Sequence, residues 1–458
     1  MIKIHKLCCV LISILLITGI AGCKSKKDFV LSNNDEYFSL DDDEATTDAD
    51  TETSETKSTK QNTGNNKNDK SGNNTSSDID LSALQGSDNF SPIEVPSRKN
   101  AYKLTNVYNK MKKGEKINVV FFGGSVTGGT KASSEAKSWR GLTTKYLKST
   151  SSGIVTSVNA ALGGTGSYLG AARFENDVLS KNPDLLFIEF TINDYYSDIS
   201  TNRIKANLEY MINKLYDQNA NADIVFVLLA NDNYFGTKYP SYTAHKEVAD
   251  YYKIPIVDFN CELYNQLKGS TAAFKKLLAD SVHPNDSGYQ QYANIMIKAL
   301  KELLVAGTTT PHKVPAKKLC SNGFSTLNNV LAGSISASGW DCKSWWNNTE
   351  YEKSNSQFRT SGLKLLYPNY LAPKETSSTI TYNFTGNSFG MLGTIKEGVT
   401  IEFVLDSGTK KTINGVSKDE LLEYPVFENL SNTSHTVTVT VYGTPPNAAI
   451  AAFVTTKP

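Results

Sequence analysis

Between residues 93 and 306, short apolar runs alternate with amphipathic segments, and this alternation limits the fold more than any other feature of the chain. Such a pattern is typical of βα units around a mainly parallel sheet. The predicted strands are 117–122, 154–160, 185–190, 224–230 and 254–259, and the predicted helices are 139–149, 171–179, 202–219, 242–252 and a last one from Ser287 to Leu303. Because ligands of open α/β sheets bind beyond the carboxyl ends of the strands, we expect the chemistry directly after each strand.

A serine follows the first predicted strand on a glycine-rich turn. Residues 123–129 read Gly-Gly-Ser-Val-Thr-Gly-Gly, which presents the Ser125 hydroxyl where a strand passes into a helix. A glycine-rich turn of this kind can also bind phosphate. However, neither Gly-Lys-Ser/Thr at P-loop spacing nor a G-x-G-x-x-G fingerprint occurs here. Ser125 is therefore a candidate nucleophile, and a nucleophilic serine needs a base.

One of the five histidines has the neighbour that a catalytic base needs. Asp280 precedes His283 by three residues, in the segment Asp-Ser-Val-His-Pro-Asn-Asp. A carboxylate at this spacing can accept a hydrogen bond from Nδ1, which leaves Nε2 free to take a serine proton. The other histidines lack such a context in the sequence: His5, His245, His312 and His435. The predicted order is the serine first, then the aspartate and the histidine together.

Two further strand ends offer donors for an oxyanion. Residues 159–166, Asn-Ala-Ala-Leu-Gly-Gly-Thr-Gly, follow the second predicted strand, and residues 191–194, Thr-Ile-Asn-Asp, follow the third. The tetrahedral intermediate of acyl transfer is stabilised by donors aimed at its negative oxygen. The Ser125 backbone N–H, a glycine N–H and an asparagine amide would supply three donors.

These four motifs, in the order in which they follow one another along the chain, resemble those of the SGNH (GDSL-like) hydrolase family over residues 116–304. The resemblance implies that Ser125 is the nucleophile, His283 the base and Asp280 its orienting partner. It also implies that Gly164 and Asn193 are oxyanion donors, with Gly163 as the alternative to Gly164. The implied fold is a flavodoxin-like three-layer α/β/α domain.

The chain departs from the family pattern at two positions. Gly124 replaces the Asp of Gly-Asp-Ser, and Thr191 replaces the Gly of Gly-x-Asn-Asp. Neither position carries the chemistry in this family, so we expect the departures to affect turn geometry and substrate fit rather than the triad.

The first 92 residues have the patterns of an export signal followed by a linker between a lipid anchor and the folded part. Residues 1–22 have a positive start, an apolar run and Ile-Ala-Gly before Cys23, which resembles a bacterial lipoprotein signal with Cys23 as the lipid anchor; an ordinary secretory signal is the alternative. Residues 23–92 are rich in Ser, Thr, Asn and acidic residues, which predicts a disordered acidic linker. The predicted location is the extracellular face of the bacterial cell membrane, contacted through the lipid only.

Residues 315–458 show short alternating runs separated by turn residues, which predicts a β-sandwich. Its aromatic residues could form a sugar-stacking platform or serve as core and lid: Trp340, Trp345, Trp346, Tyr367 and Tyr370. Since export permits oxidation, a disulfide between Cys320 and Cys342 is predicted. Cys261, in an apolar stretch, is expected to be a buried thiol.

The balance of charges argues against nucleic acid as a partner. Lys and Arg number 47 against 46 Asp and Glu, so the chain lacks the basic excess that nucleic-acid binding needs.

The predicted function is an extracellular serine esterase that removes small acyl groups, acetyl being favoured, from carbohydrate or cell-wall polysaccharide. This chemistry requires no metal or cofactor. The alternatives are a polysaccharide O-acetyltransferase and a glycan-binding lipoprotein with an idle hydrolase domain.

Overall fold

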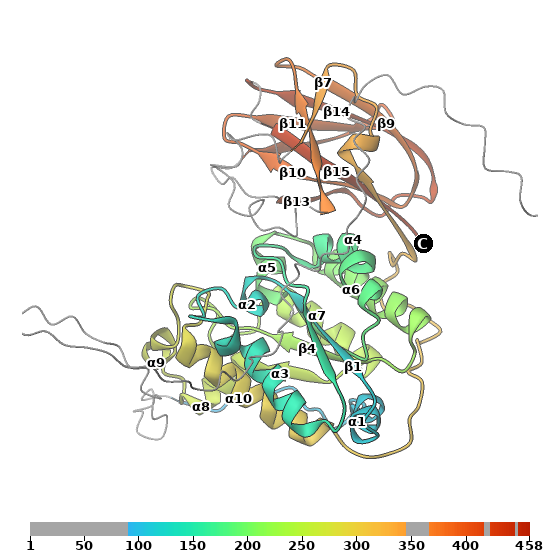
Figure 1. The fold of residues 1–458 in the computed structure, drawn as a ribbon. Coiled ribbons are helices and arrows are strands. Elements are labelled where there is room, and N and C mark those ends of the chain that lie inside the picture. The colour runs from blue at the N-terminus through green and yellow to red at the C-terminus, as the bar shows by residue number, and fades with distance from the viewer. Residues whose placement is uncertain (1–89, 345–365, 416–421, 445–447) are drawn as a thin grey trace, which may run out of the picture. The chain divides into compact units, whose positions relative to one another are not determined.

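The computed structural model describes residues 90–344, 366–415, 422–444 and 448–458 (Figure 1). We refer to the described residues up to 306 as the α/β half and to those from 315 onward as the β half. The α/β half contains all the parallel strands and nearly all the helices, and the β half consists of antiparallel sheets.

Five parallel strands in the order β2-β1-β3-β4-β5 form the sheet of the α/β half. They are β1 Ile117–Gly123, β2 Val155–Asn159, β3 Leu185–Glu189, β4 Asp223–Leu228 and β5 Ile256–Asp258. This strand order is the flavodoxin-like one, so the predicted fold class is confirmed. Every predicted strand is present, although β5 is shorter than predicted: it begins at Ile256 instead of residue 254, and Phe259 already begins the next helix.

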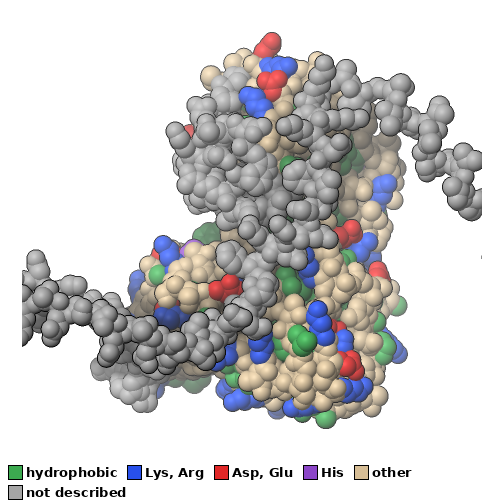
Figure 2. All heavy atoms as spheres, viewed as in Figure 1, with side chains coloured by type: hydrophobic (Ala, Val, Ile, Leu, Met, Phe, Trp, Pro, Cys, Tyr) green, Lys and Arg blue, Asp and Glu red, His purple; other side chains and the backbone are tan. Residues whose placement is uncertain are grey.

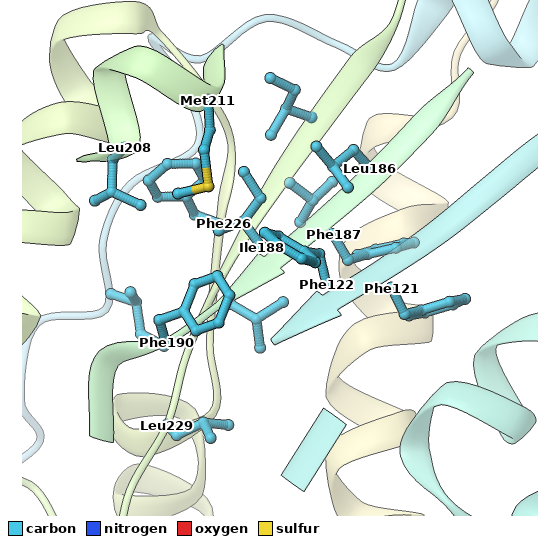
Figure 3. Close-up of a cluster of buried hydrophobic side chains, with 14 of the residues drawn as sticks. Phe121, Phe122, Leu186, Phe187, Ile188, Phe190, Leu208, Met211, Phe226 and Leu229 are labelled. Carbon is cyan, nitrogen blue, oxygen red and sulfur yellow. The ribbon is translucent and has the colours of Figure 1, made fainter. Parts of the chain in front are cut away.

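Neighbouring residues of β1 show how the sheet is covered on both faces. Phe121 packs edge-on against Trp139, with ring centroids 5.3 Å apart, whereas Phe122 packs against Phe174, 5.7 Å apart. Successive strand residues point to opposite faces, so the helices that carry Trp139 and Phe174 cover different faces. Figure 3 shows the buried cluster around these strands, with Leu208 and Met211 contributed by a long helix. The result is a three-layer α/β/α arrangement.

Ten helices of the described α/β half surround this sheet. They are α1 Thr105–Lys112, α2 Ser125–Gly128, α3 Trp139–Thr150, α4 Ser167–Asp177, α5 Thr191–Tyr196, α6 Thr201–Gln218, α7 Pro240–Tyr252, α8 Phe259–Gln266, α9 Thr271–Lys276 and α10 Asp286–Leu303. Side chains cap the N-termini of several helices. At α3 the Ser138 hydroxyl accepts from the N–H of Gly141, and at α10 the Asn285 side chain accepts from the N–H of Gly288. The predicted long helices are confirmed, but α4 begins four residues before its predicted start, and α1, α2, α5, α8 and α9 were not predicted.

The β half holds two antiparallel sheets. One contains β13-β10-β15-β8-β7, with β6 also paired to β15, and the other contains β12-β11-β14-β9. Their bounds are β6 Thr326–Leu331, β7 Trp340–Ser344, β8 Asn369–Pro373, β9 Thr379–Gly386, β10 Ser388–Ile395, β11 Thr400–Leu405, β12 Thr409–Asn414, β13 Leu422–Phe427, β14 Thr433–Tyr442 and β15 Ala448–Lys457. Inward residues of both sheets, among them Phe403, Val439 and Phe453, share one core. The predicted C-terminal β architecture is therefore present.

Strands β10 and β15 are buried on both of their faces. One face meets the sandwich core, and residues of the other, including Leu392, Ala451 and Val454, join the same core as the helices of the α/β half. Small residues permit a close approach: a Cβ on Gly390 would lie 1.8 Å from the hydroxyl of Tyr168 on α4. The two halves thus share a continuous apolar contact.

The surface carries charges of both signs. On the face of the α/β half in Figure 2, Lys and Arg side chains are interspersed with Asp and Glu side chains. Among the described helices, none has both the length and the apolar composition needed to cross a membrane.

Candidate active site

Ser125 begins α2 directly after β1, on a turn that only small residues can form. A Cβ on Gly123 would lie 2.6 Å from the carbonyl oxygen of Glu189, and a Cβ on Gly124 would lie 2.1 Å from Asn193 Nδ2. Either contact would force the surrounding atoms to shift. The departure from Asp at position 124 therefore has a local reason, since the Asn193 amide occupies the space of a side chain there.

The structure brings Ser125, His283 and Asp280 into one hydrogen-bonded chain. Nε2 of His283 lies 2.7 Å from Ser125 Oγ, and Nδ1 of His283 lies 2.9 Å from Asp280 Oδ2. The carboxylate can only accept, so Nδ1 donates to it and Nε2 accepts from the serine hydroxyl. This is the tautomer that can take the serine proton. Ser125 and His283 are 158 residues apart in the sequence, and only the fold joins them.

The Asp280 carboxylate is held ionised by its own loop. Its Oδ1 accepts from the backbone N–H groups of Val282 and His283 at 2.9 and 2.7 Å. Partial burial would raise the pKa of Asp280, but these backbone bonds and the bond from the imidazole outweigh burial and lower that pKa to about 2. The loop therefore keeps a negative charge beside the imidazole over the working pH range.

Asn193 lies on α5, just beyond β3, with its amide against the serine turn. Its Nδ2 donates to the carbonyl oxygen of Thr165 at 2.8 Å, which ties α5 to the loop after β2. Thr191, the second departure from the family pattern, is fully buried, and its hydroxyl accepts from the N–H of Leu229 at 3.2 Å. The threonine therefore braces the start of α5 against the end of β4.

Gly163 and Gly164 lie on the loop that Asn193 holds. A Cβ on Gly163 would lie 3.5 Å from Ser125 Cβ, so this glycine directly faces the serine. Gly164 has a φ of 70°, a conformation that favours glycine. Gly163, the alternative backbone oxyanion donor, thus lies beside the nucleophile, and Gly164 is the next residue of the same loop.

Glu189, the last residue of β3, supports the serine turn from beneath. Its Oε2 accepts from the Thr127 hydroxyl at 2.8 Å and from the N–H of Gly124 at 3.3 Å. Complete burial raises the pKa of Glu189 to about 8, although the bonds from Thr127 and Gly124 oppose the shift. Sequence analysis missed this residue; the available signal was a single acid at the end of an apolar strand.

Unlike the partly exposed Asp280–His283 pair, a second carboxylate–histidine pair, Asp194–His245, is fully buried. Nε2 of His245 is 2.7 Å from Asp194 Oδ2, and both side chains are fully buried. Asp194 Oδ1 also accepts from the N–H of Ser167 at 2.6 Å, at the start of α4. Sequence analysis found no partner for His245, because its partner lies 51 residues away.

Each of the four histidines in the described residues contacts an aspartate: His245 with Asp194, His283 with Asp280, His312 with Asp223 and His435 with Asp406. Of these four, His283 alone has a serine hydroxyl on its second ring nitrogen. Within the same described residues, no group of three or more His, Cys, Asp or Glu side chains is arranged to hold a metal ion.

The N-terminus of α4 receives a further carboxylate from the β half. Glu423 on β13 accepts from the backbone N–H groups of Gly166 and Leu169 at 2.6 and 2.8 Å. Burial raises the pKa of Glu423 to about 7, and the two backbone bonds oppose that shift. The loop with the candidate oxyanion glycines therefore ends at a helix that two buried carboxylates, Asp194 and Glu423, hold in place.

The predicted disulfide between Cys320 and Cys342 is not formed. The Cys320 thiol is buried and donates to the carbonyl oxygen of Asn202 at 3.3 Å, next to α6 of the α/β half. Cys342 lies on β7, where it is paired with Leu371 of β8. The two cysteines thus lie on different parts of the fold, Cys320 beside α6 and Cys342 on β7, and no disulfide joins them.

Cys261 is a buried thiol, as predicted. Its side chain is 1% exposed, and burial together with the Asp258 carboxylate raises the pKa of the thiol to about 12. A thiol of this kind is protonated at neutral pH and is a poor nucleophile.

Three aromatic residues of the predicted sugar platform are buried: Trp340, Tyr367 and Tyr370. They are buried as core residues would be, which agrees with the alternative prediction that these aromatics belong to the core and lid. Trp345, Trp346 and the predicted lipid anchor Cys23 lie outside the described residues.

Comparison with known proteins agrees with this geometry. Residues 121–291 match the GDSL-like Lipase/Acylhydrolase family. No curated protein matches the sequence significantly.

One solved protein aligns with this chain over both halves. A two-domain esterase (CEX) active on acetylated mannans aligns with a TM-score of 0.63 and 20% identity, over 79% of this chain and 98% of that chain. The same esterase co-crystallised with mannopentaose gives 0.64 and 20%, over 80% and 99%. An acetyl xylan esterase, AlAXEase, aligns at 0.34 and 22%, over 40% of this chain and 100% of that chain.

Proposed function

We propose that the protein is a serine carboxylic ester hydrolase that removes acetyl groups from polysaccharide through an acyl-enzyme on Ser125. The match of residues 121–291 to the GDSL-like lipase/acylhydrolase family supports this reaction class. The observation that carries the proposal is the hydrogen-bonded chain Ser125–His283–Asp280, with distances of 2.7 and 2.9 Å.

In the first half-reaction, Ser125 Oγ attacks the ester carbonyl carbon while His283 Nε2 takes its proton. The negative oxygen of the tetrahedral intermediate accepts from the Ser125 backbone N–H, the Asn193 amide and the N–H of Gly164 or Gly163. When the carbon–oxygen bond to the sugar breaks, His283 returns the proton to the departing sugar oxygen. The acetyl group stays on the serine.

In the second half-reaction, water takes the place of the sugar hydroxyl. His283 Nε2 removes one proton from the water, and the resulting oxygen attacks the acyl carbon. Collapse of the second intermediate releases acetate and returns the proton to Ser125 Oγ. Throughout both steps the ionised Asp280 stabilises the imidazolium that forms on His283.

One observation and one prediction support a carbohydrate substrate. The esterase with the similar two-part fold is active on acetylated mannans. The predicted export signal and acidic linker would present the folded part to the cell-wall layer. We extend the substrate class to this chain on those grounds.

The decisive experiment is acetate release by the purified full-length protein from 4-nitrophenyl acetate, acetylated mannan and acetylated xylan. Ser125→Ala is expected to abolish release from all three. Ser149→Ala, which removes an exposed serine of α3, is the matched control and should retain full activity. Serine-dependent release from the aryl ester alone would contradict the polysaccharide substrate.

A second arm adds a deacetylated oligosaccharide as acceptor. Transfer of acetyl to sugar at a higher rate than to water would favour the O-acetyltransferase alternative. Retained affinity for glycan without any acetate release would favour a binding protein with an idle hydrolase domain.

We propose that the protein is anchored through lipid on Cys23, at the extracellular face of the membrane. Metabolic labelling with a fatty acid tests this directly, and Cys23→Ser should abolish incorporation. Release of unlabelled protein into the medium would instead indicate an ordinary secretory signal.

A further inference from the structure

Tyr196 is an exposed aromatic residue on the same short helix as the candidate oxyanion donor. Its side chain is 54% exposed, and the other aromatic residue among the large exposed hydrophobic side chains of the described chain is Tyr442. Tyr196 follows Asn193 by three residues on α5, and residues at this spacing lie on one face of a helix. Tyr196 therefore lies about one helical turn from Asn193, on the same face of α5.

The Tyr196 ring is held rigidly although it is exposed. Its hydroxyl accepts from Asn231 Nδ2 at 2.8 Å, and Asn231 is fully buried. The ring packs edge-on against Tyr195, with centroids 5.4 Å apart and planes at 76°. Tyr195 packs in turn against Tyr234 and Tyr239 at 4.8 and 5.6 Å. An exposed ring fixed at its hydroxyl and at one edge is pre-organised for contact with another surface.

The loop that anchors Tyr196 also touches the base loop. Asn231 Oδ1 accepts from the backbone N–H groups of Asn233 and Tyr234, which shapes the turn after β4. The N–H of Asp232 donates to the carbonyl oxygen of Ser281 at 3.0 Å, two residues before His283. Tyr196 thus lies on a rim bounded by α5, which carries Asn193, and by a loop bonded to the one that carries His283.

We propose that Tyr196 is a sugar-stacking residue of the active-site rim, against which the apolar face of a pyranose ring of the acetylated substrate packs. The inference rests on the proposed function, because it assumes that the ester is carried by a sugar. An aromatic ring matches the patch of C–H groups on a pyranose face, and the polar tip of tyrosine remains satisfied by Asn231. In this role Tyr196 contributes to the binding of the sugar and takes no part in the bond-breaking steps.

The test compares Tyr196→Ala, Tyr196→Phe and the wild type in the full-length protein, on acetylated manno-oligosaccharides and on 4-nitrophenyl acetate. Tyr196→Ala should raise KM for the oligosaccharide about three- to tenfold, the range expected when one aromatic contact is lost. The rise in KM for the aryl ester should be several times smaller, since that substrate has no sugar. Tyr196→Phe keeps the ring and should recover most of the loss.

Tyr442→Ala is the matched control, since it removes a tyrosine that is 44% exposed, at the end of β14. Its KM for the oligosaccharide should equal that of the wild type. An equal rise in KM for both substrates in Tyr196→Ala would overturn the proposal, because the residue would then support the ester site in general. So would an unchanged oligosaccharide KM.

The variants Ser125→Ala and Tyr196→Ala distinguish a wrong stacking role from a wrong reaction. If acetate release from the oligosaccharide is abolished by Ser125→Ala but is indifferent to Tyr196→Ala, only the stacking role is wrong. If Ser125→Ala leaves release unchanged, the proposed function itself is wrong.

Discussion

The Glu423 carboxylate accepts a hydrogen bond of 2.6 Å from the backbone N–H of Gly166, across 257 residues of sequence. Gly166 lies two residues after Gly164 and directly before α4. Glu423 also accepts from the N–H of Leu169, so one carboxylate satisfies two of the N–H groups that a helix start leaves without intrahelical partners. A residue of the β half thereby helps to fix the loop beside the nucleophile.

Glu423→Gln should lower kcat several-fold with a smaller effect on KM. The glutamine side chain has one accepting oxygen, and its amide group would face a backbone N–H that it cannot accept from. Leaving one buried N–H without a partner should also cost about 1–3 kcal/mol of unfolding free energy. Steady-state kinetics and urea unfolding measure the two effects. Glu402→Gln, on the other sheet of the sandwich, is the control. Equal kinetics for both variants would show that Glu423 does not position the loop beside the nucleophile.

Burial of Glu189 should make stability fall with rising pH. In the unfolded chain this carboxyl titrates near 4.5, whereas burial raises its pKa to about 8 in the fold. Between these values the folded protein binds a proton that the unfolded chain has released, so the stabilisation is present below pH 4.5 and is lost as pH rises through 8. Glu189→Gln cannot ionise and should reduce the decline in unfolding free energy between pH 5 and 9. If the unfolding free energy of Glu189→Gln falls with pH as steeply as that of the wild type, ionisation of Glu189 is not the cause of the decline.

Asp280→Asn should lower kcat by about two to four orders of magnitude, because an amide no longer fixes the imidazole tautomer or stabilises the imidazolium. The far-UV circular dichroism should remain that of the wild type. Asp286→Asn provides the comparison, since Asp286 lies on the same segment but bonds Ser133 and Lys137 instead of the imidazole. Activity close to wild type in Asp280→Asn would mean that another group orients His283.

Gly124→Ala should lower kcat about tenfold to a hundredfold, because the new Cβ would displace the Asn193 amide, and misplacement of about 1 Å can cost a hundredfold in rate. Gly128→Ala changes a glycine of the same motif whose Cβ would lie 3.7 Å from Ala161 Cβ, an ordinary contact. Full activity is expected for Gly128→Ala. Similar losses in both variants would show that the motif is sensitive to any side chain rather than to this contact.

Features that depend on near neighbours in the chain could be predicted from the sequence. The period of apolar residues indicates a strand or a helix directly, and the three-residue spacing of Asp280 and His283 already brings the carboxylate to the imidazole. The five parallel strands were therefore predicted close to their observed bounds, and the His283 side chain lies within hydrogen-bond distance of those of both Ser125 and Asp280. Short elements such as α5 were missed because six residues hold too little periodicity to separate a helix from a loop.

The α/β pattern, the serine turn and the Asp280–His283 pair could be predicted because each depends on residues that are close together in the chain. The fold was needed to show that Glu189 and Glu423 are buried, that His245 pairs with Asp194, and that Cys320 and Cys342 form no disulfide. Burial and pairing depend on which distant segments pack together. The identity of one residue does not reveal whether its partner lies three or 257 positions away.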